Sequence, residues 1–357
     1  MISSYTSSKL KWLTLIATLT VVWIHSNAIA FLPNTSRLTS FTAQFLMTRM
    51  TAWAVPCFFM VSGFLFTYSY RNSYRRFLGK KIKSLMFPYF CWALIGTVMT
   101  IPLTLTCNIL QGKSLWSNSF VEKGNYTFFG CIDQIFGIVE TGPIDNGPLW
   151  YVRVLLLLFL ISPLFMLVYK SSKLPILEVI IALILIVFFK SAYKFGDFEL
   201  RLWAIPYFII GMAAAKIDFW EKRIPVWLCI LCGTCYVLFA VYESMVHISI
   251  LKPYWILSYP WKVYCAIIFW AGLYDVCSKQ ADRIVKYIPM TFFIYCLHQP
   301  VLGYFRSFSR FFFCDSGTVL LLNCILSFLL TLTLCIFISK IFERICPKTY
   351  KFLIGGR

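Results

Sequence analysis

The sequence predicts an all-α integral membrane protein, a single domain over residues 1–357 with about ten transmembrane helices. Two observations carry this prediction. The chain is 60% hydrophobic and only 13% charged, whereas soluble domains carry charge at about a quarter of their positions. Apolar runs recur along almost the whole length, with basic residues between them, and a soluble protein would instead show amphipathic helices with an outward polar face.

Each predicted span is an apolar run close to the roughly 20 helical residues that cross a bilayer core of about 30 Å. No internal repeat is evident, which weighs against transporters built from inverted repeats. The predicted spans, in order, are 10–32, 43–68, 85–109, 148–169, 174–192, 200–216, 224–244, 256–277, 289–307 and 317–341.

The basic segment 71–84 sets the predicted orientation, because loops rich in Lys and Arg stay in the cytoplasm. An even number of spans then puts both termini on that side too. The longest polar loop, 110–147, is expected outside, where it could act as a lid. Its acidic residues are Glu122, Asp133, Glu140 and Asp145.

The formal charge of +19 comes from 33 Lys and Arg against 14 Asp and Glu. These bases flank the spans, so membrane lipid is the expected partner and nucleic acid is not. No metal site is expected: the run Cys229-x-x-Cys232-x-x-Cys235 lies in an apolar segment without acidic or histidine partners. Cys107 and Cys131 could pair near the outer face, which sequence alone leaves open.

Two of the three histidines, His25 and His298, fall inside predicted spans. Ionisable groups at membrane depth usually face the bundle interior and mark a pathway or reaction centre. A neutral imidazole, with an ordinary pKa of about 6.5, can accept a proton from a hydroxyl as a general base must. The alternative is a helix–helix hydrogen bond. His247 reads as a loop residue.

The chain resembles the membrane-bound acyltransferase type 3 family, which includes bacterial O-acetyltransferases of O-antigen, capsule and exopolysaccharide. The motifs follow the family's order over almost the whole chain. They are Val21-Val-Trp-Ile-His25-Ser26, Val55-Pro56-Cys-Phe-Phe-Met-Val-Ser62-Gly63-Phe-Leu-Phe, the basic run leading to Pro88-Tyr89-Phe90, Gly147-Pro148-Leu149-Trp150-Tyr151-Val152-Arg153, Tyr207-Phe208-Ile-Ile-Gly211 and Ile294-Tyr295-Cys-Leu297-His298-Gln299-Pro300.

This resemblance implies ten spans, an acyl-CoA donor from the cytoplasm, and a glycan or lipid-linked glycan acceptor at the outer face. It makes His25 the principal catalytic candidate, with His298 supporting it. The family usually carries an Arg eleven residues before the His, and this chain has Thr14 there. Lys11, one turn earlier, could supply the positive charge, although it lacks the planar fork of Arg.

Several basic residues are candidates for holding the phosphates of CoA by charge-assisted hydrogen bonds. The alternative is anchoring on anionic lipid. The candidates are Arg75, Arg76, Lys80, Lys81 and Lys83, together with Lys11.

Arg153 lies one turn inside the fourth span and could stabilise the oxyanion of the thioester; an ion pair with Glu243 is the alternative. Trp150 and Tyr151 could stack on a sugar or belong to the aromatic belt at the membrane surface. A Ser62 nucleophile is disfavoured, because small residues such as Ser62-Gly63 usually permit close helix packing.

Three further polar residues, Ser26, Asn27 and Gln299, lie beside the histidines and could fix a tautomer or bind the acceptor hydroxyl.

Together with the resemblance, the sequence therefore predicts an acyltransferase, with acetyl the expected group, in the bacterial inner membrane. The rivals are a transporter or flippase whose path is lined by His25, His298, Arg153 and Glu243, and a non-catalytic relative.

Overall fold

The computed structural model describes most of the chain as helices, with one small antiparallel hairpin. The hairpin pairs β1 (Tyr193–Phe195) with β2 (Phe198–Leu200). The described residues are 2–26, 36–70, 73–113, 128–139, 142–171, 173–188, 193–195, 198–248, 255–288, 290–312 and 317–356.

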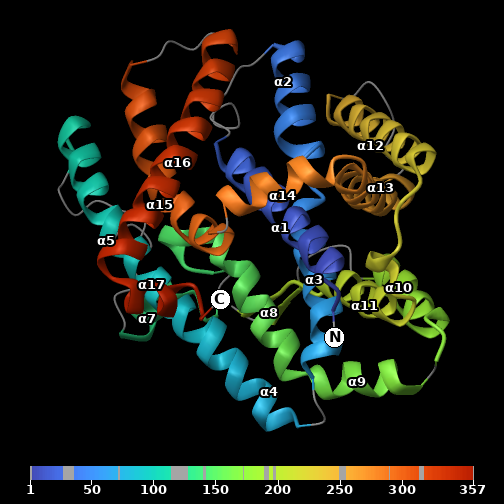
Figure 1. Cartoon of the computed structure of the whole chain (residues 1–357). Coiled ribbons are helices and arrows are strands. Elements are labelled where there is room, and N and C mark those ends of the chain that lie inside the picture. The colour runs from blue at the N-terminus through green and yellow to red at the C-terminus, as the bar shows by residue number, and fades with distance from the viewer. Residues whose placement is uncertain are drawn as a thin grey trace.

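Figure 1 shows the helices packed around α1 and α8, with the described N- and C-terminal ends both close to this centre. The helical elements are α1 (Ser4–His25), α2 (Arg37–Ala43), η2 (Gln44–Arg49), α3 (Ala54–Ser69), α4 (Tyr74–Lys81), η3 (Ile82–Met86), α5 (Phe87–Leu110), α7 (Phe128–Phe136), η4 (Ile144–Leu149), α8 (Trp150–Leu160), α9 (Ser162–Ser171), α10 (Ile176–Phe188), α11 (Ala204–Lys216), η5 (Phe219–Glu221), α12 (Val226–His247), α13 (Trp255–Val276), α14 (Ser278–Tyr287), α15 (Thr291–Phe312), α16 (Gly317–Ile345) and α17 (Pro347–Leu353).

The helical class is confirmed, several apolar helices are consistent with a multi-pass membrane protein, and each of the ten predicted spans overlaps a helix. Among the described residues, however, only four helices are long and apolar enough to cross a membrane, or five if the pair α8 and α9, bent by 62°, forms one span. The four are Arg37–Ser69, Tyr74–Leu110, Val226–His247 and Leu321–Ile345. The count of ten and the orientation of the termini therefore remain predictions.

The other helices fall short for two physical reasons. α10 and α11 have 13 residues each, fewer than the roughly 20 that a crossing needs. α1, α13 and α15 have 22 residues each, as α12 does, but carry polar groups such as Thr14, Lys262 and His298. Polar side chains on buried helices are what a site inside the bundle requires.

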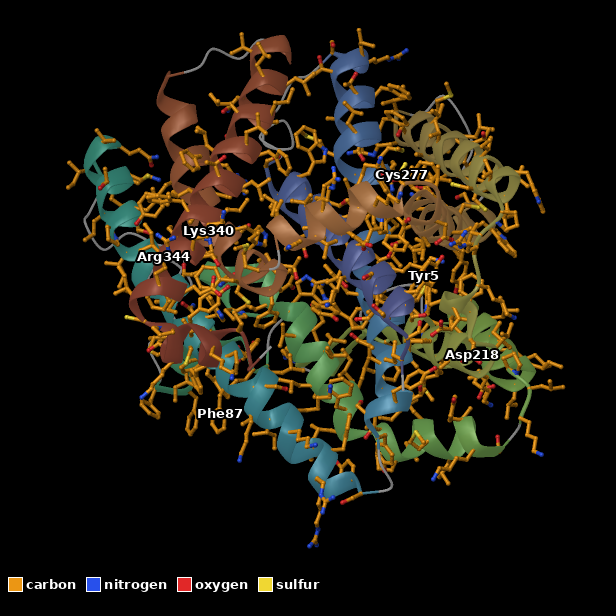
Figure 2. The ribbon with its side chains drawn as sticks, viewed as in Figure 1. Tyr5, Phe87, Asp218, Cys277, Lys340 and Arg344 are labelled. Atoms are coloured by element: carbon orange, nitrogen blue, oxygen red, sulfur yellow. The ribbon has the colours of Figure 1, made fainter. Side chains whose placement is uncertain are left out.

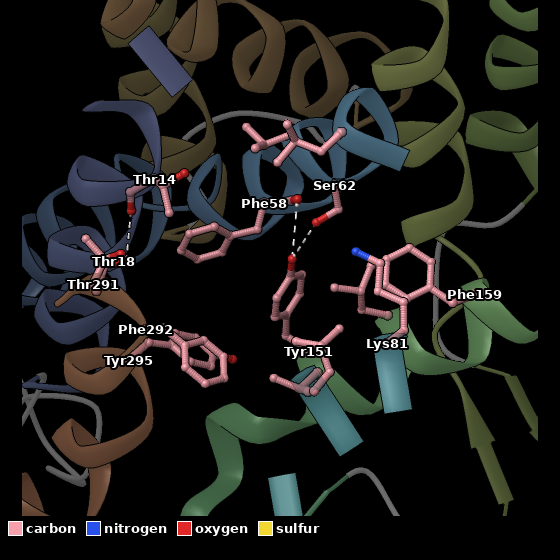
Figure 3. Close-up of a pocket in the computed structure, with 15 residues that line it drawn as sticks. Thr14, Thr18, Phe58, Ser62, Lys81, Tyr151, Phe159, Thr291, Phe292 and Tyr295 are labelled. Carbon is pink, nitrogen blue, oxygen red and sulfur yellow. Dashed lines mark hydrogen bonds between the residues drawn. The ribbon is translucent and has the colours of Figure 1, made fainter. Parts of the chain in front are cut away.

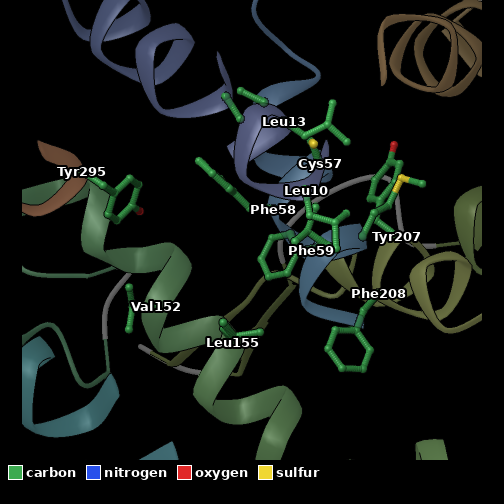
Figure 4. Packing of buried hydrophobic residues seen from close by; sticks show 14 of the residues in the cluster. Leu10, Leu13, Cys57, Phe58, Phe59, Val152, Leu155, Tyr207, Phe208 and Tyr295 are labelled. Atoms are coloured by element: carbon green, nitrogen blue, oxygen red, sulfur yellow. The ribbon is translucent and has the colours of Figure 1, made fainter. Parts of the chain in front are cut away.

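The helices α3 and α11 meet through two glycines. A Cβ atom added at Gly63 would stand 2.0 Å from the Phe208 carbonyl oxygen, and one added at Gly211 would stand 2.0 Å from that of Met60. Each glycine thus lies against a backbone carbonyl of the other helix, which is possible because neither carries a side chain. Phe59 and Phe208 pack in the large hydrophobic cluster around this seam (Figure 4).

Buried ion pairs join helices that are distant in sequence. The Lys9 ammonium, 0% exposed, lies 2.8 Å from Asp275 Oδ2 and ties α1 to the end of α13. Tyr5, labelled in Figure 2 among the side chains that fill the space between ribbons, donates to the same carboxylate. Breaking one partner of such a pair would leave an uncompensated buried charge.

The described end of loop 110–147 turns back to the start of α5. The Tyr89 hydroxyl donates to the Phe136 carbonyl at 2.5 Å, and the Phe90 and Phe136 rings lie 5.1 Å apart. α7 therefore packs on the first turn of α5, beside the basic α4 and η3, and this part of the expected outer lid does not lie at the far end of α5. Residues 114–127 and Glu140 lie outside the described residues.

Candidate active site

The two histidine side chains lie against each other. His25 is the last residue of α1 and His298 lies in α15, and their ring centroids are 5.4 Å apart with planes tilted by 44°. His298 is fully buried, whereas His25 is partly exposed. One substrate hydroxyl could therefore contact both imidazoles.

The hydrogen-bond partner of His298 sets its tautomer. Its Nδ1 lies 2.7 Å from the Tyr295 carbonyl oxygen, one turn earlier in α15. Because a carbonyl only accepts, Nδ1 carries the hydrogen and Nε2 presents its lone pair. Nε2 is buried and has no hydrogen-bond partner in the described part of the chain. It is thus an acceptor available to a hydroxyl.

A cavity of about 300 Å³ lies beside this pair, between α1, α3, α8 and α15 (Figure 3). Its wall is mostly apolar, and its hydroxyl groups and one lysine are the polar exceptions. The lining residues are Thr14, Thr18, Phe58, Val61, Ser62, Leu65, Lys81, Leu85, Tyr151, Val152, Leu155, Phe159, Thr291, Phe292 and Tyr295.

The polar part of the wall centres on Tyr151. Its hydroxyl donates to the Phe58 carbonyl at 3.3 Å and lies 2.9 Å from Ser62 Oγ, as the dashed lines of Figure 3 mark. The Thr14 and Thr18 hydroxyls instead donate to carbonyls of their own helix, at 2.7 and 2.8 Å. Thr14, which stands where the family usually has Arg, is therefore a wall residue without a charge.

Neither histidine lines the cavity, which comes within one helical turn of His298 and two turns of His25. Tyr295 lines it and precedes His298 by three residues, with ring centroids 6.0 Å apart. Thr18 lines it and lies about two turns before His25 on α1.

Of the basic candidates for CoA, only Lys81 lines the cavity. Its ammonium lies 4.8 Å from the centre of the Phe159 ring, a cation–π distance. Lys11 on α1 is exposed and outside the lining. Four further candidates are exposed and also outside it, namely Arg75, Arg76, Lys80 and Lys83.

The Arg153 guanidinium donates to three backbone carbonyls. Its Nε, Nη1 and Nη2 donate to the carbonyls of Ile138, Glu199 and Val139 at 3.0, 3.1 and 3.2 Å. The ion pair with Glu243, the alternative considered from sequence, is wrong, because Glu243 pairs with Lys262 and lies 3.8 Å from Arg49.

The predicted acceptor-binding residues do not gather in one place. Tyr151 belongs to the cavity, whereas the Cζ atom of Arg201 covers the Trp150 ring at 4.0 Å. The Ser26 hydroxyl donates to the Trp23 carbonyl at 2.7 Å. The Gln299 side-chain oxygen is buried without a hydrogen-bond partner among the described residues. Asn27 lies outside the described residues.

Sequence reasoning missed two residues of this region. Tyr295 could have been found, because a residue three positions before His298 shares its helix face. Asn146, whose amide lies between α5 and α15, gave no periodic signal, since it belongs to the short irregular element η4.

The cysteines form neither a metal site nor a disulfide where the structure describes them. Cys107 and Cys131 are free thiols, as are Cys229, Cys232 and Cys235. No group of three or more His, Cys, Asp or Glu within the described ranges could hold a metal ion.

Comparison with known proteins now identifies the family. The chain is 23% identical over 328 residues to proteins named "Probable poly-beta-1,6-N-acetyl-D-glucosamine export protein" from Staphylococcus aureus strains MSSA476, MW2 and N315. The match covers 88% of this chain and 86% of each relative. No solved structure matches. The acyltransferase domain family matches residues 8–340, and the chain therefore belongs to the acyltransferase type 3 family.

Proposed function

We propose that this protein transfers an acyl group, expected to be acetyl, from acyl-CoA in the cytoplasm to a hydroxyl of a cell-surface carbohydrate such as O-antigen, capsule or exopolysaccharide. The observation that carries the proposal is the contact between His25 and His298, with His298 one helical turn from a cavity whose wall includes Lys81. Family membership supports the acyl-transfer chemistry. The expected location is the bacterial inner membrane.

The cavity suits the thioester arm of the donor. Its volume of about 300 Å³ is at the lower end of small-molecule sites, which run from about 300 to 1,000 Å³, so it fits the arm and not the whole nucleotide. The phosphates would then lie at the mouth near Lys81, with Arg75, Arg76, Lys80 and Lys83 contributing to the surrounding positive field.

The reaction needs one proton acceptor and hydrogen-bond donors for the thioester. In the proposed step the acceptor oxygen attacks the thioester carbon, the carbon–sulfur bond breaks, and His25 takes the hydroxyl proton and returns it to the CoA thiolate. His298 packs against the His25 ring and supports it. The Ser62 hydroxyl, 2.9 Å from the Tyr151 hydroxyl, would turn to donate to the carbonyl oxygen, and Arg153 keeps a positioning role.

The relatives' printed names favour a carbohydrate and also a second candidate function, export of a polysaccharide. An exporter would move the glycan without CoA turnover. The two candidates therefore differ in one measurable product, the free CoA thiol.

The test uses purified full-length protein in detergent with acetyl-CoA and oligomers of β-1,6-linked N-acetylglucosamine. We expect acceptor-dependent release of thiol, and an acetylated oligomer by mass spectrometry. His25→Ala should lower the rate by at least about 100-fold, the loss typical of a missing general base, whereas His247→Ala at the end of α12 should not.

Full activity in His25→Ala would overturn the assigned mechanism. No thiol release from the wild type with this or other glycan acceptors, together with glycan transport in vesicles, would favour export.

A further inference from the structure

The helix that carries His298 has a gap in its own hydrogen bonding. Pro300, inside α15, has no N–H group, so it cannot donate to the carbonyl four residues earlier. That carbonyl belongs to Cys296, which lies in the turn from Tyr295 to His298. Cys296 is fully buried, and a carbonyl buried away from water needs a donor from elsewhere.

The side chain of Asn146 supplies this donor. Its Nδ2 lies 2.9 Å from the Cys296 carbonyl oxygen and 3.2 Å from that of Trp92 in α5. The side chain is fully buried. Both partners only accept, so the amide must present its NH₂ group to them, which fixes its orientation.

The approach of Asn146 depends on a glycine in α5. A Cβ atom added at Gly96 would stand 2.9 Å from Asn146 Cβ, too close without displacement. The Asn146 backbone is non-helical, with φ −138° and ψ 59°, inside the short element η4. The site is thus built from three elements that meet at one amide.

The element η4 contacts α15 a second time at Tyr295, one residue before Cys296. The Tyr295 hydroxyl donates to the Pro148 carbonyl. η4 then runs directly into α8, whose Tyr151 and Val152 line the cavity. One rigid segment therefore links the cavity wall to the turn that orients His298.

We propose that Asn146 is a positioning residue: by replacing the hydrogen bond that Pro300 removes, it holds the Tyr295–His298 turn so that the His298 ring stays against His25. This inference rests on the proposed acyl transfer for its effect on rate. Its effect on His298 itself does not depend on that reaction.

A double-mutant cycle tests the inference. Asn146→Ala should lower kcat for CoA release by about 30-fold, within the range for a buried group left unsatisfied, with KM for acetyl-CoA unchanged. Pro300→Ala restores an N–H to the helix, which can donate to the Cys296 carbonyl in place of Asn146. The fold-decrease in kcat of the double variant Asn146→Ala/Pro300→Ala should therefore be much smaller than the product of the fold-decreases of the two single variants. Ile144→Ala, exposed in the same element, is the matched control and should change nothing.

A second readout needs no enzymatic activity. Carbethoxylation of His298, followed by mass spectrometry on full-length protein in detergent, should be about fivefold faster in Asn146→Ala, because a turn freed from its hydrogen bond opens more often. The double variant should return to the wild-type rate. Thermal unfolding of each variant separates positioning from loss of fold.

Two results would overturn the proposal: losses that multiply in the double variant, or an unchanged modification rate of His298 in folded Asn146→Ala. If instead the wild type releases no thiol while His298 modification responds as expected, the positioning stands and the acyl-transfer function falls.

Discussion

Two helix seams of this protein are built on opposite principles. The α3–α11 seam closes through Gly63 and Gly211, each with its Cα against a carbonyl of the partner helix. The α1–α15 seam brings together two imidazoles whose centroids are 5.4 Å apart, and one ring nitrogen of His298 has no partner within the described residues. At its two glycines the first seam has no space for a side chain, whereas helices of the second seam line the cavity.

This difference separates stability from function. Close backbone packing is a main source of helix association in a bilayer, where the hydrophobic effect between helices is weak. Unpaired buried polar atoms are costly and persist where they serve a site. We therefore expect substitutions in the α3–α11 seam to lower the free energy of unfolding. Substitutions around the α1–α15 cavity should instead change KM for the acyl-CoA donor.

The largest effect should come from filling the closed seam. Gly211→Leu would force its side chain into the Met60 backbone. We expect the free energy of unfolding to fall by at least about 3 kcal/mol, or the variant protein not to accumulate in the membrane at all. Thermal unfolding in detergent and membrane yield measure this. Gly79→Ala on α4, where an added Cβ meets nothing within 4 Å, is the control and should be neutral or slightly stabilising. A stable, fully active Gly211→Leu would refute the account of the seam.

Part of this contrast could be predicted from the sequence. The Ser62-Gly63 pair indicates close packing, and histidines at His25 and His298 indicate an interior site, because small and ionisable residues have few other uses in a span. The sequence does not say which helix each one meets. The reciprocal fit of Gly63 with Gly211 depends on the register between α3 and α11, which no local pattern encodes.

The surroundings of two other site candidates could not be read from the sequence either. Arg153 sits one turn inside α8, where depth suggested a catalytic charge, but the chain folds back so that three carbonyls need its donors. Lys80 and Lys81 look equivalent in sequence, yet helix geometry turns only Lys81 into the cavity.

The next effect concerns the cavity itself. Thr14→Trp would fill much of the roughly 300 Å³ space, and we expect KM for acetyl-CoA to rise about 30-fold, equivalent to about 2 kcal/mol. Initial-rate kinetics over a range of donor concentrations measure it. Thr20→Trp, on the same helix but outside the lining, serves as the control. An unchanged KM in Thr14→Trp would mean that the donor binds elsewhere.

The smallest effect distinguishes two neighbouring lysines. Lys81→Ala removes the one ammonium that lines the cavity, so KM for acetyl-CoA should rise about fivefold at low salt, or about 1 kcal/mol, and the difference should shrink as salt screens the phosphates. Lys80→Ala, exposed one residue earlier on α4, should change KM less than about twofold, as surface charges usually do. Equal effects from both lysines would mean that a diffuse positive surface, rather than the cavity mouth, attracts the donor.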